Sequence, residues 1–500
     1  MAVEYAYLII DLGTTKTEVV LYDSSVRVLR STSFRTRETV HDGYACIDPQ
    51  ACVLAVMNSI KELDVAGAGV RRVKIMATGM GSTLLACTPD GVVRYPAIAW
   101  HQAARTAMPP GLPTEGTGKV PIATYPVYKI STLKQAVPEE AAVFAALPDY
   151  VSAALSGFKT WVTDRTFASR SMMYSDRDHR WHGEILRALS IGADTLPTVV
   201  GSGETIGTVP PELRKNTHLP DEATVVTGMH DHAATLYAAT QIRNALGIKA
   251  LINAAGTTES AMELVPFCPE VVREAPVRGL NTQATWSTDA LAVTSYPTLS
   301  GRFLELAESF AVPWDVDEAM VCPNVLAACP MRRLQPGDPG LIMPGRPGTF
   351  TVHDLWKALI LSSQYELKTS VADIAAFGAQ APYKAVLLLG GQARNSRLRR
   401  LKSVVLGLPL YSGLHENFAS FGAALLLSCR YGFDQGTTSR AAERSASALT
   451  VQYPDPELVR QARITYQRYI SMLGETGVAP GATPQSTPQG VNKWPTLPPS

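Results

Sequence analysis

The chain opens on two apolar runs separated by a glycine turn. Tyr7–Ile10 is apolar and ends at Asp11, the turn Gly13-Thr14-Thr15 follows, and Thr17–Tyr22 resumes with alternating apolar positions. A β-rich run, a glycine turn and a second alternating run predict a β-hairpin. Strand pairs mixed with helical stretches further along predict an α/β fold whose sheet is partly antiparallel.

The same order of elements restarts near residue 245. Ile248–Ile252 is apolar, Gly256-Thr257-Thr258 is a turn, and Ser260–Val265 alternates again. Two copies of one strand–turn–strand unit predict a duplicated α/β architecture with a boundary near residues 241–247. We therefore divide the chain into two domains, a helical extension and a Pro-rich tail that we expect to be disordered: residues 1–243, 244–435, 436–474 and 475–500.

The pattern predicts further strands and helices between and after the hairpins. The expected strands are Val73–Ala77, Ala223–Thr227 and Ala385–Leu389. The expected helices are Pro49–Leu63, Glu139–Leu155, Ala233–Thr240 and Ser396–Val405.

Composition excludes several classes of protein. Of the 500 residues, 46% are hydrophobic, which excludes a mainly disordered chain, and 45 basic against 44 acidic residues give a net charge of +1. That balance favours a small-molecule partner over nucleic acid. Seven cysteines without a C-x-x-C pair favour reduced thiols in a cytoplasmic protein. No apolar run reaches the length of a membrane span, so we expect no membrane partner.

The first glycine turn has the components of a phosphate-binding hairpin. Gly13 lets the backbone approach an anion, and the hydroxyls of Thr14 and Thr15 add donors. Asp11 stands at the strand end, where a carboxylate can hold Mg²⁺. An ordinary hairpin turn is the alternative for this motif alone. The repeat at Gly256-Thr257-Thr258 favours a polyphosphate held from both sides.

Two further segments carry candidate chemistry. Gly390-Gly391-Gln392-Ala393-Arg394-Asn395 follows an apolar strand and opens a helix, which suits a phosphate or nucleoside, or is simply a tight turn. Gly228-Met229-His230-Asp231-His232 lies between a strand and a helix. It allows a His-Asp-His metal site, an Asp N-cap, or a general base at Asp231 that activates a hydroxyl.

Taken together, these segments resemble the FGGY carbohydrate kinases, a family of the actin-like superfamily of sugar kinases. The resemblance extends over roughly residues 5–435, with its motifs in the expected order. The matching segments are Asp11–Thr15, Tyr95–Trp100, Thr163–Trp181, Gly228–Asp231, Gly256–Glu259 and Gly390–Asn395. The xylulokinase branch is the most similar.

The resemblance implies two ribonuclease-H-like domains with an active-site cleft between them. It also implies an enzyme that uses ATP and Mg²⁺ to phosphorylate a hydroxyl of a ketose or polyol, with Asp231 as the general base and Asp11 and Asp231 holding the metal. The implied ATP-binding residues are Asp11, Gly13, Thr14, Thr15, Lys16, Gly256, Thr257, Thr258, Gly390, Gly391, Gln392 and Asn395. The implied substrate residues are Ser82, Trp100, His101, Gln102, His230 and Asp231. Relatives are often homodimers.

The segments that contact the sugar depart from the xylulokinase pattern. Met80 and Ser82 stand where that branch has Gln and His, and Gln102 replaces an acidic residue. Met343-Pro344-Gly345-Arg346 replaces a Gly-Glu-Arg loop of the second domain. The catalytic motifs are retained, so a sugar kinase is favoured over a silent sugar- or nucleotide-binding regulator and over an ATPase of the actin or chaperone type.

Overall fold

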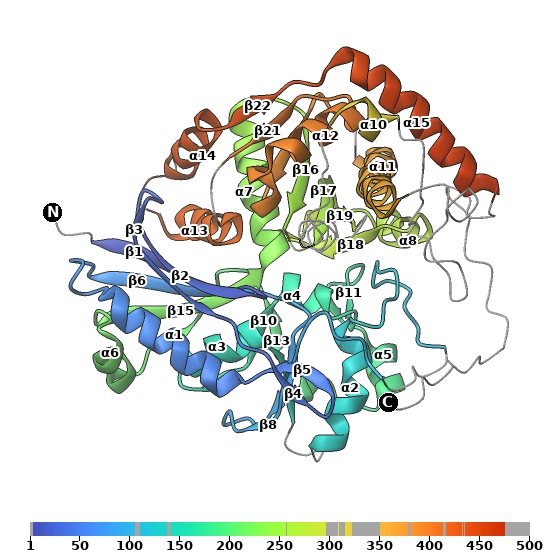
Figure 1. The fold of residues 1–500 in the computed structure, drawn as a ribbon. Helices are drawn as coiled ribbons and strands as arrows, with labels where there is room; N and C mark the ends of the chain where they lie inside the picture. Colours follow the sequence, from blue (N-terminus) through green and yellow to red (C-terminus); the bar gives the residue numbers. More distant parts are fainter. Residues whose placement is uncertain are drawn as a thin grey trace.

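The computed structural model describes residues 4–105, 111–137, 142–256, 258–296, 309, 316–322, 351–378, 382–413, 417–432, 434 and 436–475. Expectations for Thr257, Met343–Arg346 and the tail after Glu475 fall outside these residues. The described chain forms two lobes, each built around a large sheet with helices on its faces (Figure 1).

The first lobe contains a six-stranded sheet. Its strands, in spatial order, are β14 (Thr205–Thr208), β15 (Glu222–His230), β6 (Arg72–Gly79), β1 (Tyr5–Leu12), β2 (Lys16–Asp23) and β3 (Val28–Arg35). β1 and β2 form the predicted antiparallel hairpin, whereas β1 pairs in parallel with β6. The expectation of a partly antiparallel sheet is therefore confirmed.

The alternation of β1 divides its side chains between two hydrophobic cores. Leu8 and Ile10 pack in a cluster with residues of α1 (Pro49–Leu63). Tyr7 and Ile9 face the opposite way, into a cluster shared with α7 (Asp231–Leu246) and α13 (Phe418–Tyr431). Successive strand residues point to opposite faces, so a strand that is buried throughout is covered on both sides.

The rest of the first lobe consists of smaller sheets and helices. A five-stranded sheet has the order β4 (Thr39–His41), β5 (Tyr44–Ile47), β8 (Val93–Ile98), β7 (Leu84–Cys87) and β9 (Val143–Ala146). Two short pairs join β10 (Val162–Asp164) to β13 (Thr198–Val200), and β11 (Tyr174–Ser175) to β12 (Arg180–Trp181). The helices are α2 (Pro126–Ala136), α3 (Leu147–Leu155), α4 (Arg165–Arg170), α5 (Gly183–Leu189), η2 (Ala193–Thr195) and α6 (Pro211–Thr217).

One predicted helix of this lobe is wrong in its first part. Within the described part of the expected helix Glu139–Leu155, residues 143–146 form strand β9, and helix α3 begins at Leu147. Pro148 is the second residue of α3; it lacks a backbone N–H, which suits the first turn of a helix and not the interior of a longer one. β9 pairs with β7, so tertiary pairing decides the state of this apolar segment.

The second lobe repeats the first hairpin. Its seven-stranded sheet has the order β18 (Asn281–Ala284), β19 (Ala290–Ser295), β17 (Glu259–Pro266), β16 (Ala250–Ala255), β20 (Ala385–Leu389), β21 (Leu410–Ser412) and β22 (Thr450–Gln452). β16 is antiparallel to β17 and parallel to β20, as β1 is to β2 and β6. The other helices are α8 (Pro269–Val277), α10 (Glu318–Val321), α11 (Val352–Gly378), η3 (Gly391–Arg394), α12 (Ser396–Leu406), α14 (Thr437–Ser447) and α15 (Pro456–Glu475).

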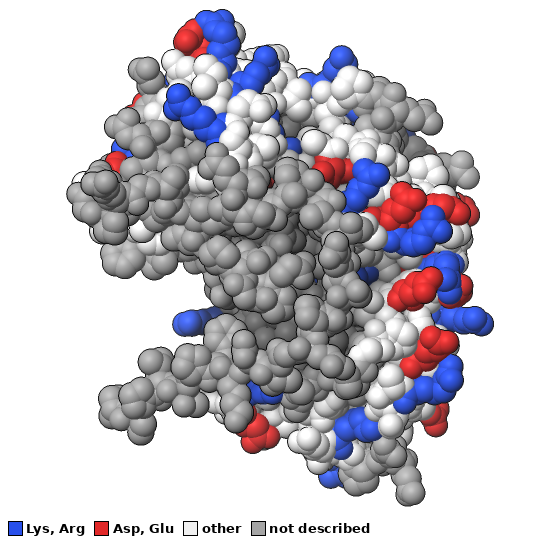
Figure 2. Space-filling model, turned by 90° about the vertical axis from the view of Figure 1, so that its right-hand side faces the viewer, with Lys and Arg blue, Asp and Glu red and all other residues white. Residues whose placement is uncertain are grey.

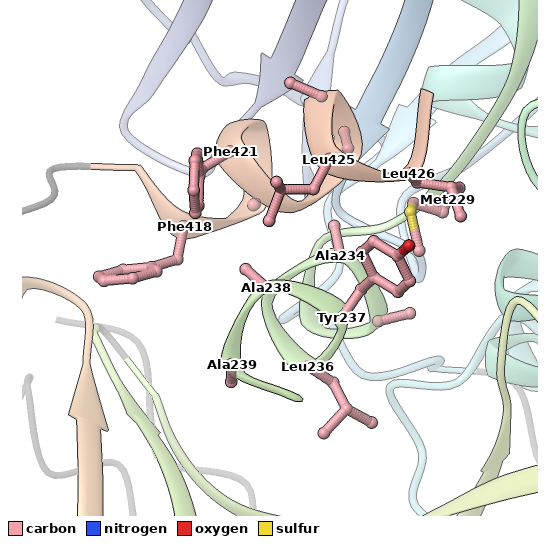
Figure 3. Packing of buried hydrophobic residues seen from close by; sticks show 14 of the residues in the cluster. Met229, Ala234, Leu236, Tyr237, Ala238, Ala239, Phe418, Phe421, Leu425 and Leu426 are labelled. Atoms are coloured by element: carbon pink, nitrogen blue, oxygen red, sulfur yellow. The ribbon is translucent and has the colours of Figure 1, made fainter. Parts of the chain in front are cut away.

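Helices α7 and α13 cross closely between the two sheets (Figure 3). Phe421 and Leu425 of α13 lie over Ala234 and Ala238 of α7 in the figure. A Cβ atom on Gly422 would lie 1.9 Å from the carbonyl oxygen of Ala234. Small residues therefore allow the two helices to approach closely. This packing also fixes the position of α7, whose first residue is Asp231.

The described surface and helices show two further properties. Figure 2 shows Lys and Arg side chains interspersed with Asp and Glu on the described part of one face. Within the described ranges, no helix combines the length and apolarity that crossing a bilayer requires.

Candidate active site

The first phosphate turn joins β1 to β2 and is held by the segment after β3. The amide of Gly13 donates to the Asp11 carbonyl, and a Cβ at Gly13 would lie 2.6 Å from the Lys16 carbonyl oxygen. The Thr36 hydroxyl donates to the Gly13 carbonyl at 2.8 Å, and the Thr36 amide donates to the Thr15 carbonyl at 3.0 Å. A side chain at position 13 would clash with the backbone, so the turn requires glycine there. The two hydrogen bonds from Thr36 hold the shape of the turn.

Asp11 lies at the junction of the two lobes. The side-chain amide of Asn417 donates to Asp11 Oδ2 and to Glu18 Oε2, each at 2.7 Å. Asn417 also caps α13, because its Oδ1 accepts from the Ser420 amide. Burial and the nearby Asp231 raise the pKa of Asp11 to about 7. Lys16, also predicted at this site, is half exposed and pairs with Glu18.

Asp231 is placed where β15 ends and α7 begins. A Cβ at Gly228 would lie 1.8 Å from the Ala77 carbonyl oxygen, so glycine lets β15 run close to β6 at this point. Asp231 is the first residue of α7 and its Oδ1 accepts from the His232 amide at 2.7 Å. The N-cap position belongs to His230, so the N-cap alternative for Asp231 is wrong.

The Asp231 carboxyl is accessible and electrostatically perturbed. Its side chain is 31% exposed, enough for contact with a substrate. Burial raises its pKa to about 6, against the opposing effects of the His232 amide and the Arg170 guanidinium. A carboxyl of this kind is largely ionised near neutral pH, as a general base must be.

His230 lies behind Asp231 as a neutral partner. Burial lowers the pKa of His230 far below its usual range, with further effects from His232 and Arg170. Its Nδ1 lies 2.9 Å from the Gln283 amide nitrogen, and its Nε2 lies 3.1 Å from Asp231 Oδ1. The imidazole therefore lies between the Gln283 amide of the second lobe and the Asp231 carboxyl.

Beside Asp231 lies a cluster around the Arg170 guanidinium, whose residues Arg170, Tyr125 and Tyr296 sequence analysis missed. The Arg170 guanidinium lies over the rings of Tyr125 and Tyr296, 4.9 and 5.2 Å from their centroids. Tyr296 also lies beside His232, at 5.8 Å between ring centroids. A Cβ at Gly81 would lie 3.0 Å from Arg170 Cγ and 2.5 Å from His230 Cδ2. We call Arg170, Tyr125, Tyr296, His230 and His232 the Arg170 cluster.

Two of the predicted substrate residues, Trp100 and His101, lie beside the first phosphate turn. Trp100 Nε1 donates to the Thr14 hydroxyl at 2.8 Å, which joins the predicted substrate segment to the phosphate turn. Ser82 is buried, and its hydroxyl has no hydrogen-bond partner within the described residues. The Gln102 side chain accepts from the Ala45 amide at 3.3 Å and so supports β5. A cleft of about 600 Å³ is lined by Thr14, Thr15, Arg35, Thr36, Arg37, Glu38, Thr39 and His101.

Lys129 joins the loop that carries Ser82 to the loop that precedes Trp100. Its fully buried ammonium donates to the carbonyls of Ser82 and Ala99, each at 2.8 Å. Burial, together with Arg170, lowers the pKa of Lys129 to about 7. A buried lysine that bonds carbonyls on two loops fixes their separation, although no motif predicts it.

The second lobe brings its two predicted nucleotide motifs together. The Gln392 amide donates to the Gly256 carbonyl at 2.9 Å, and the Gly256 amide donates to the Thr258 carbonyl at 2.9 Å. Gly390 has φ +92°, and a Cβ there would lie 2.6 Å from the Ala255 carbonyl oxygen. Gly391 begins η3, and the Asn395 side chain caps α12 by accepting from the Leu398 amide. Asn395 thus has a structural role in addition to its predicted one.

Strand β18 of the second lobe docks against the first. Thr282 donates from its backbone to the Gly118 carbonyl at 2.7 Å and from its hydroxyl to Asp176 Oδ2 at 3.0 Å. Lys119 and Asp176 form a buried ion pair at 2.7 Å. The same strand carries Gln283, which contacts His230. The second lobe therefore helps to build the site around Asp231.

Comparison with known proteins agrees with this architecture. Two lobes built on a repeated hairpin define the actin-like two-domain fold, as predicted. The structure of a xylulose kinase from Lactobacillus acidophilus superposes with a TM-score of 0.74 at 17% identity, covering 95% of this chain and 99% of that one. A glycerol kinase from Plasmodium falciparum, solved with ADP, gives 0.76 at 16% identity, covering 94% and 98%.

Sequence comparison finds relatives of the first lobe. Residues 6–238 match the model of the N-terminal domain of the FGGY family of carbohydrate kinases. The glycerol kinase of Brucella ovis is 30% identical over 229 residues, or 41% of this chain and 45% of its own length. The chain thus matches less than half the length of this curated relative. The first lobe is therefore similar to the N-terminal domain of the FGGY carbohydrate kinases, in agreement with the resemblance that the motifs indicated.

Proposed function

We propose that this protein is a kinase that transfers the γ-phosphoryl group of ATP to a hydroxyl of a ketose or polyol. The observation that carries the proposal is the position of Asp231. Asp231 lies close enough to Asp11, in the strand that leads into the first phosphate turn, to raise its pKa, and it also lies close to Arg170 and His230 of the Arg170 cluster. A base between the phosphate donor and the hydroxyl acceptor is what in-line phosphoryl transfer requires.

Asp231 acts as the general base. As the acceptor oxygen bonds to the γ-phosphorus, its proton passes to the Asp231 carboxylate, and the bond from that phosphorus to the bridging oxygen breaks to release ADP. The proton then leaves Asp231 for solvent. His230 Nε2, 3.1 Å from Oδ1, holds the carboxyl in place. General-base assistance contributes about 10²–10⁴-fold to the rate.

Asp11 and Asp231 fit a Mg²⁺ site. Their carboxylates are close enough that Asp231 raises the pKa of Asp11, and oxygen ligands of this charge are what Mg²⁺ prefers. No group of three His, Cys, Asp or Glu side chains in the described part of the chain forms a metal site by itself. Mg²⁺ usually keeps several waters and is bound through one or two carboxylates together with substrate phosphates. The ion would neutralise charge on the phosphates.

The acceptor is taken from the class that relatives indicate. Matched relatives include proteins named xylulose kinase and glycerol kinase, which supports ketoses and polyols as the acceptor class. Met80 and Ser82 differ from the xylulokinase pattern, so xylulose itself is not our first choice. A cytoplasmic location and a homodimer are part of this proposal.

A coupled ADP-release assay over ketopentoses, ketohexoses, heptuloses and polyols tests the proposal. We expect sugar-dependent ADP release, and a fall in kcat of at least about 10²-fold in Asp231→Asn with ATP affinity nearly unchanged. Asp178→Asn is the control, since Asp178 is equally exposed at 31% but pairs with Arg177. Binding without turnover would indicate the silent regulator. An unchanged rate in Asp231→Asn would remove Asp231 as the base.

A further inference from the structure

Two arginines line the cleft beside the first phosphate turn. Arg35 ends β3, Arg37 follows two residues later, and both are exposed. Neither side chain forms a hydrogen bond or an ion pair within the described residues. Thr36 between them is buried and holds the turn through the carbonyls of Gly13 and Thr15. The segment that holds the phosphate turn therefore also supplies two guanidinium groups to the cleft.

The cleft brings together residues from two predicted groups. Thr14 and Thr15 belong to the predicted ATP-binding residues, and His101 belongs to the predicted substrate residues. The lining residues that the structure describes all belong to the first lobe, whereas the nucleotide motifs around Gly256 and Gln392 belong to the second. An occupant of the cleft thus contacts the phosphate turn and the predicted substrate segment together. That is the position of the acceptor rather than of the nucleoside.

The described lining of the cleft has an excess of positive charge. Arg35 and Arg37 share it with one carboxylate, Glu38, whose Oε2 lies 3.8 Å from His101 Nε2. With His101 counted as neutral, two guanidinium groups and one carboxylate give a net charge of +1. A neutral ketose or polyol offers no charge to these groups. A phosphate ester carries about two negative charges near pH 7, and its oxygens match the planar fork of arginine.

The cleft is larger than a phosphate group alone requires. Its volume of about 600 Å³ lies within the range of sites that hold whole small molecules, roughly 300–1,000 Å³. Thr15 and Thr39 add hydroxyl groups to the lining, which can donate to and accept from the hydroxyls of a sugar. The occupant that fits both the charge and the volume is a phosphate group attached to a polyhydroxy body.

We propose that the cleft binds the phosphorylated sugar or polyol that the reaction forms, with its phosphate on Arg35 and Arg37. This inference rests on the proposed kinase function and adds regulation by the product to the same site. A neutral acceptor has no group for the two guanidinium ions, whereas the product gains their charge-assisted hydrogen bonds once it carries the phosphoryl group. The two arginines therefore slow product release and make the enzyme sensitive to its own product.

Calorimetry with matched ligands, in the presence of ADP, tests the inference. We compare D-ribulose 5-phosphate with D-ribulose and D-glucitol 6-phosphate with D-glucitol, and add the ester of any acceptor that the ADP-release panel identifies. The wild-type protein should bind each ester at least about 10-fold more tightly than its parent, and added salt should reduce this preference because both arginines are exposed. Arg35→Gln/Arg37→Gln should lose most of the preference, and Arg35→Lys/Arg37→Lys should keep part of it.

Product inhibition supplies a second readout. In Arg35→Gln/Arg37→Gln, the inhibition constant of the product should rise about 10-fold more than KM for the neutral acceptor. Arg71→Gln is the matched control. Arg71 is exposed and has no partner among the described residues, and it lies just before β6, at the end of the sheet opposite to the phosphate turn. This control should keep the wild-type preference for the esters.

The outcomes separate this inference from the proposed function. Equal affinity for esters and parents in the wild-type protein, or an effect of the two arginines on the ATP analogue AMP-PNP alone, would overturn the inference and leave the kinase proposal standing. If no acceptor releases ADP, the kinase proposal fails and calorimetry still decides the site. Ester binding that needs the two arginines then supports a phosphate-ester site in the cleft, and its absence refutes it.

Discussion

The buried ion pair between Lys402 and Glu259 should hold the two nucleotide motifs of the second lobe together. Glu259 begins β17 directly after the Gly-Thr-Thr turn, and Lys402 lies on α12, which follows the Gly-Gly motif. Neither side chain has any exposed surface. Burial lowers the pKa of Lys402, whereas the Glu259 carboxylate opposes this shift. The change that we consider is Lys402→Met, which keeps the volume and removes the charge.

The expected cost follows from the carboxylate left behind. Removing one partner of a fully buried pair costs about 3–5 kcal/mol, because the remaining charge stays desolvated. At a urea slope of about 2 kcal/mol per M, the midpoint of the second lobe should fall by about 2 M. The double variant Lys402→Met/Glu259→Leu removes both charges and should recover most of the loss. ATP should bind the single variant more weakly, since the turn loses its anchor.

Urea unfolding followed by circular dichroism measures the stability, and ATP titration measures the affinity. Lys249→Met is the control. Lys249 pairs with Glu263, which lies on β17 as Glu259 does, and Glu263 would still have its second partner, Arg243, at 2.8 Å. That variant should lose less than about 1 kcal/mol. A loss of under 1 kcal/mol in Lys402→Met, or a double variant as unstable as the single one, would refute the reasoning.

Three further predictions concern packing, protonation and the phosphate turn. Gly422→Ala should lower the unfolding free energy by about 1–3 kcal/mol in urea unfolding, since its Cβ would lie 1.9 Å from a carbonyl oxygen, whereas Gly183→Ala, with open space around it, should not. Burial holds the pKa of Lys129 at about 7, below the unfolded value of about 10.4. Between these values the unfolded chain binds more protons, so the unfolding free energy of the wild-type protein should rise relative to that of Lys129→Met as pH rises from 7 to 9. A difference between the two proteins that does not change with pH contradicts this. Gly256→Val should weaken ATP binding about 10-fold or more with unchanged stability, because a Cβ there meets nothing within 4 Å and would occupy only the approach of the phosphates; an unchanged dissociation constant would remove this turn from the site.

Local sequence determined the elements that carry the motifs. The hairpin at Asp11, the strand Ala385–Leu389 and the helix after Asn395 form where predicted, since periodicity, glycine turns and caps are properties of neighbouring residues. The repeated Gly-Thr-Thr units also predicted two lobes with the same hairpin. These features needed no long-range contact to be recognised.

Only the tertiary structure decided which side chains share the site. Arg170, Tyr125 and Tyr296 belong to no common motif, and they meet because β18 and β19 of the second lobe dock on the first. Lys129 is an ordinary helical lysine in the sequence, and folding alone buries it against two loops. Residues 143–146 form a strand because β7 offers a pairing edge. Burial and pairing over long separations set the charges and contacts around Asp231, and such effects leave no periodic trace along the chain.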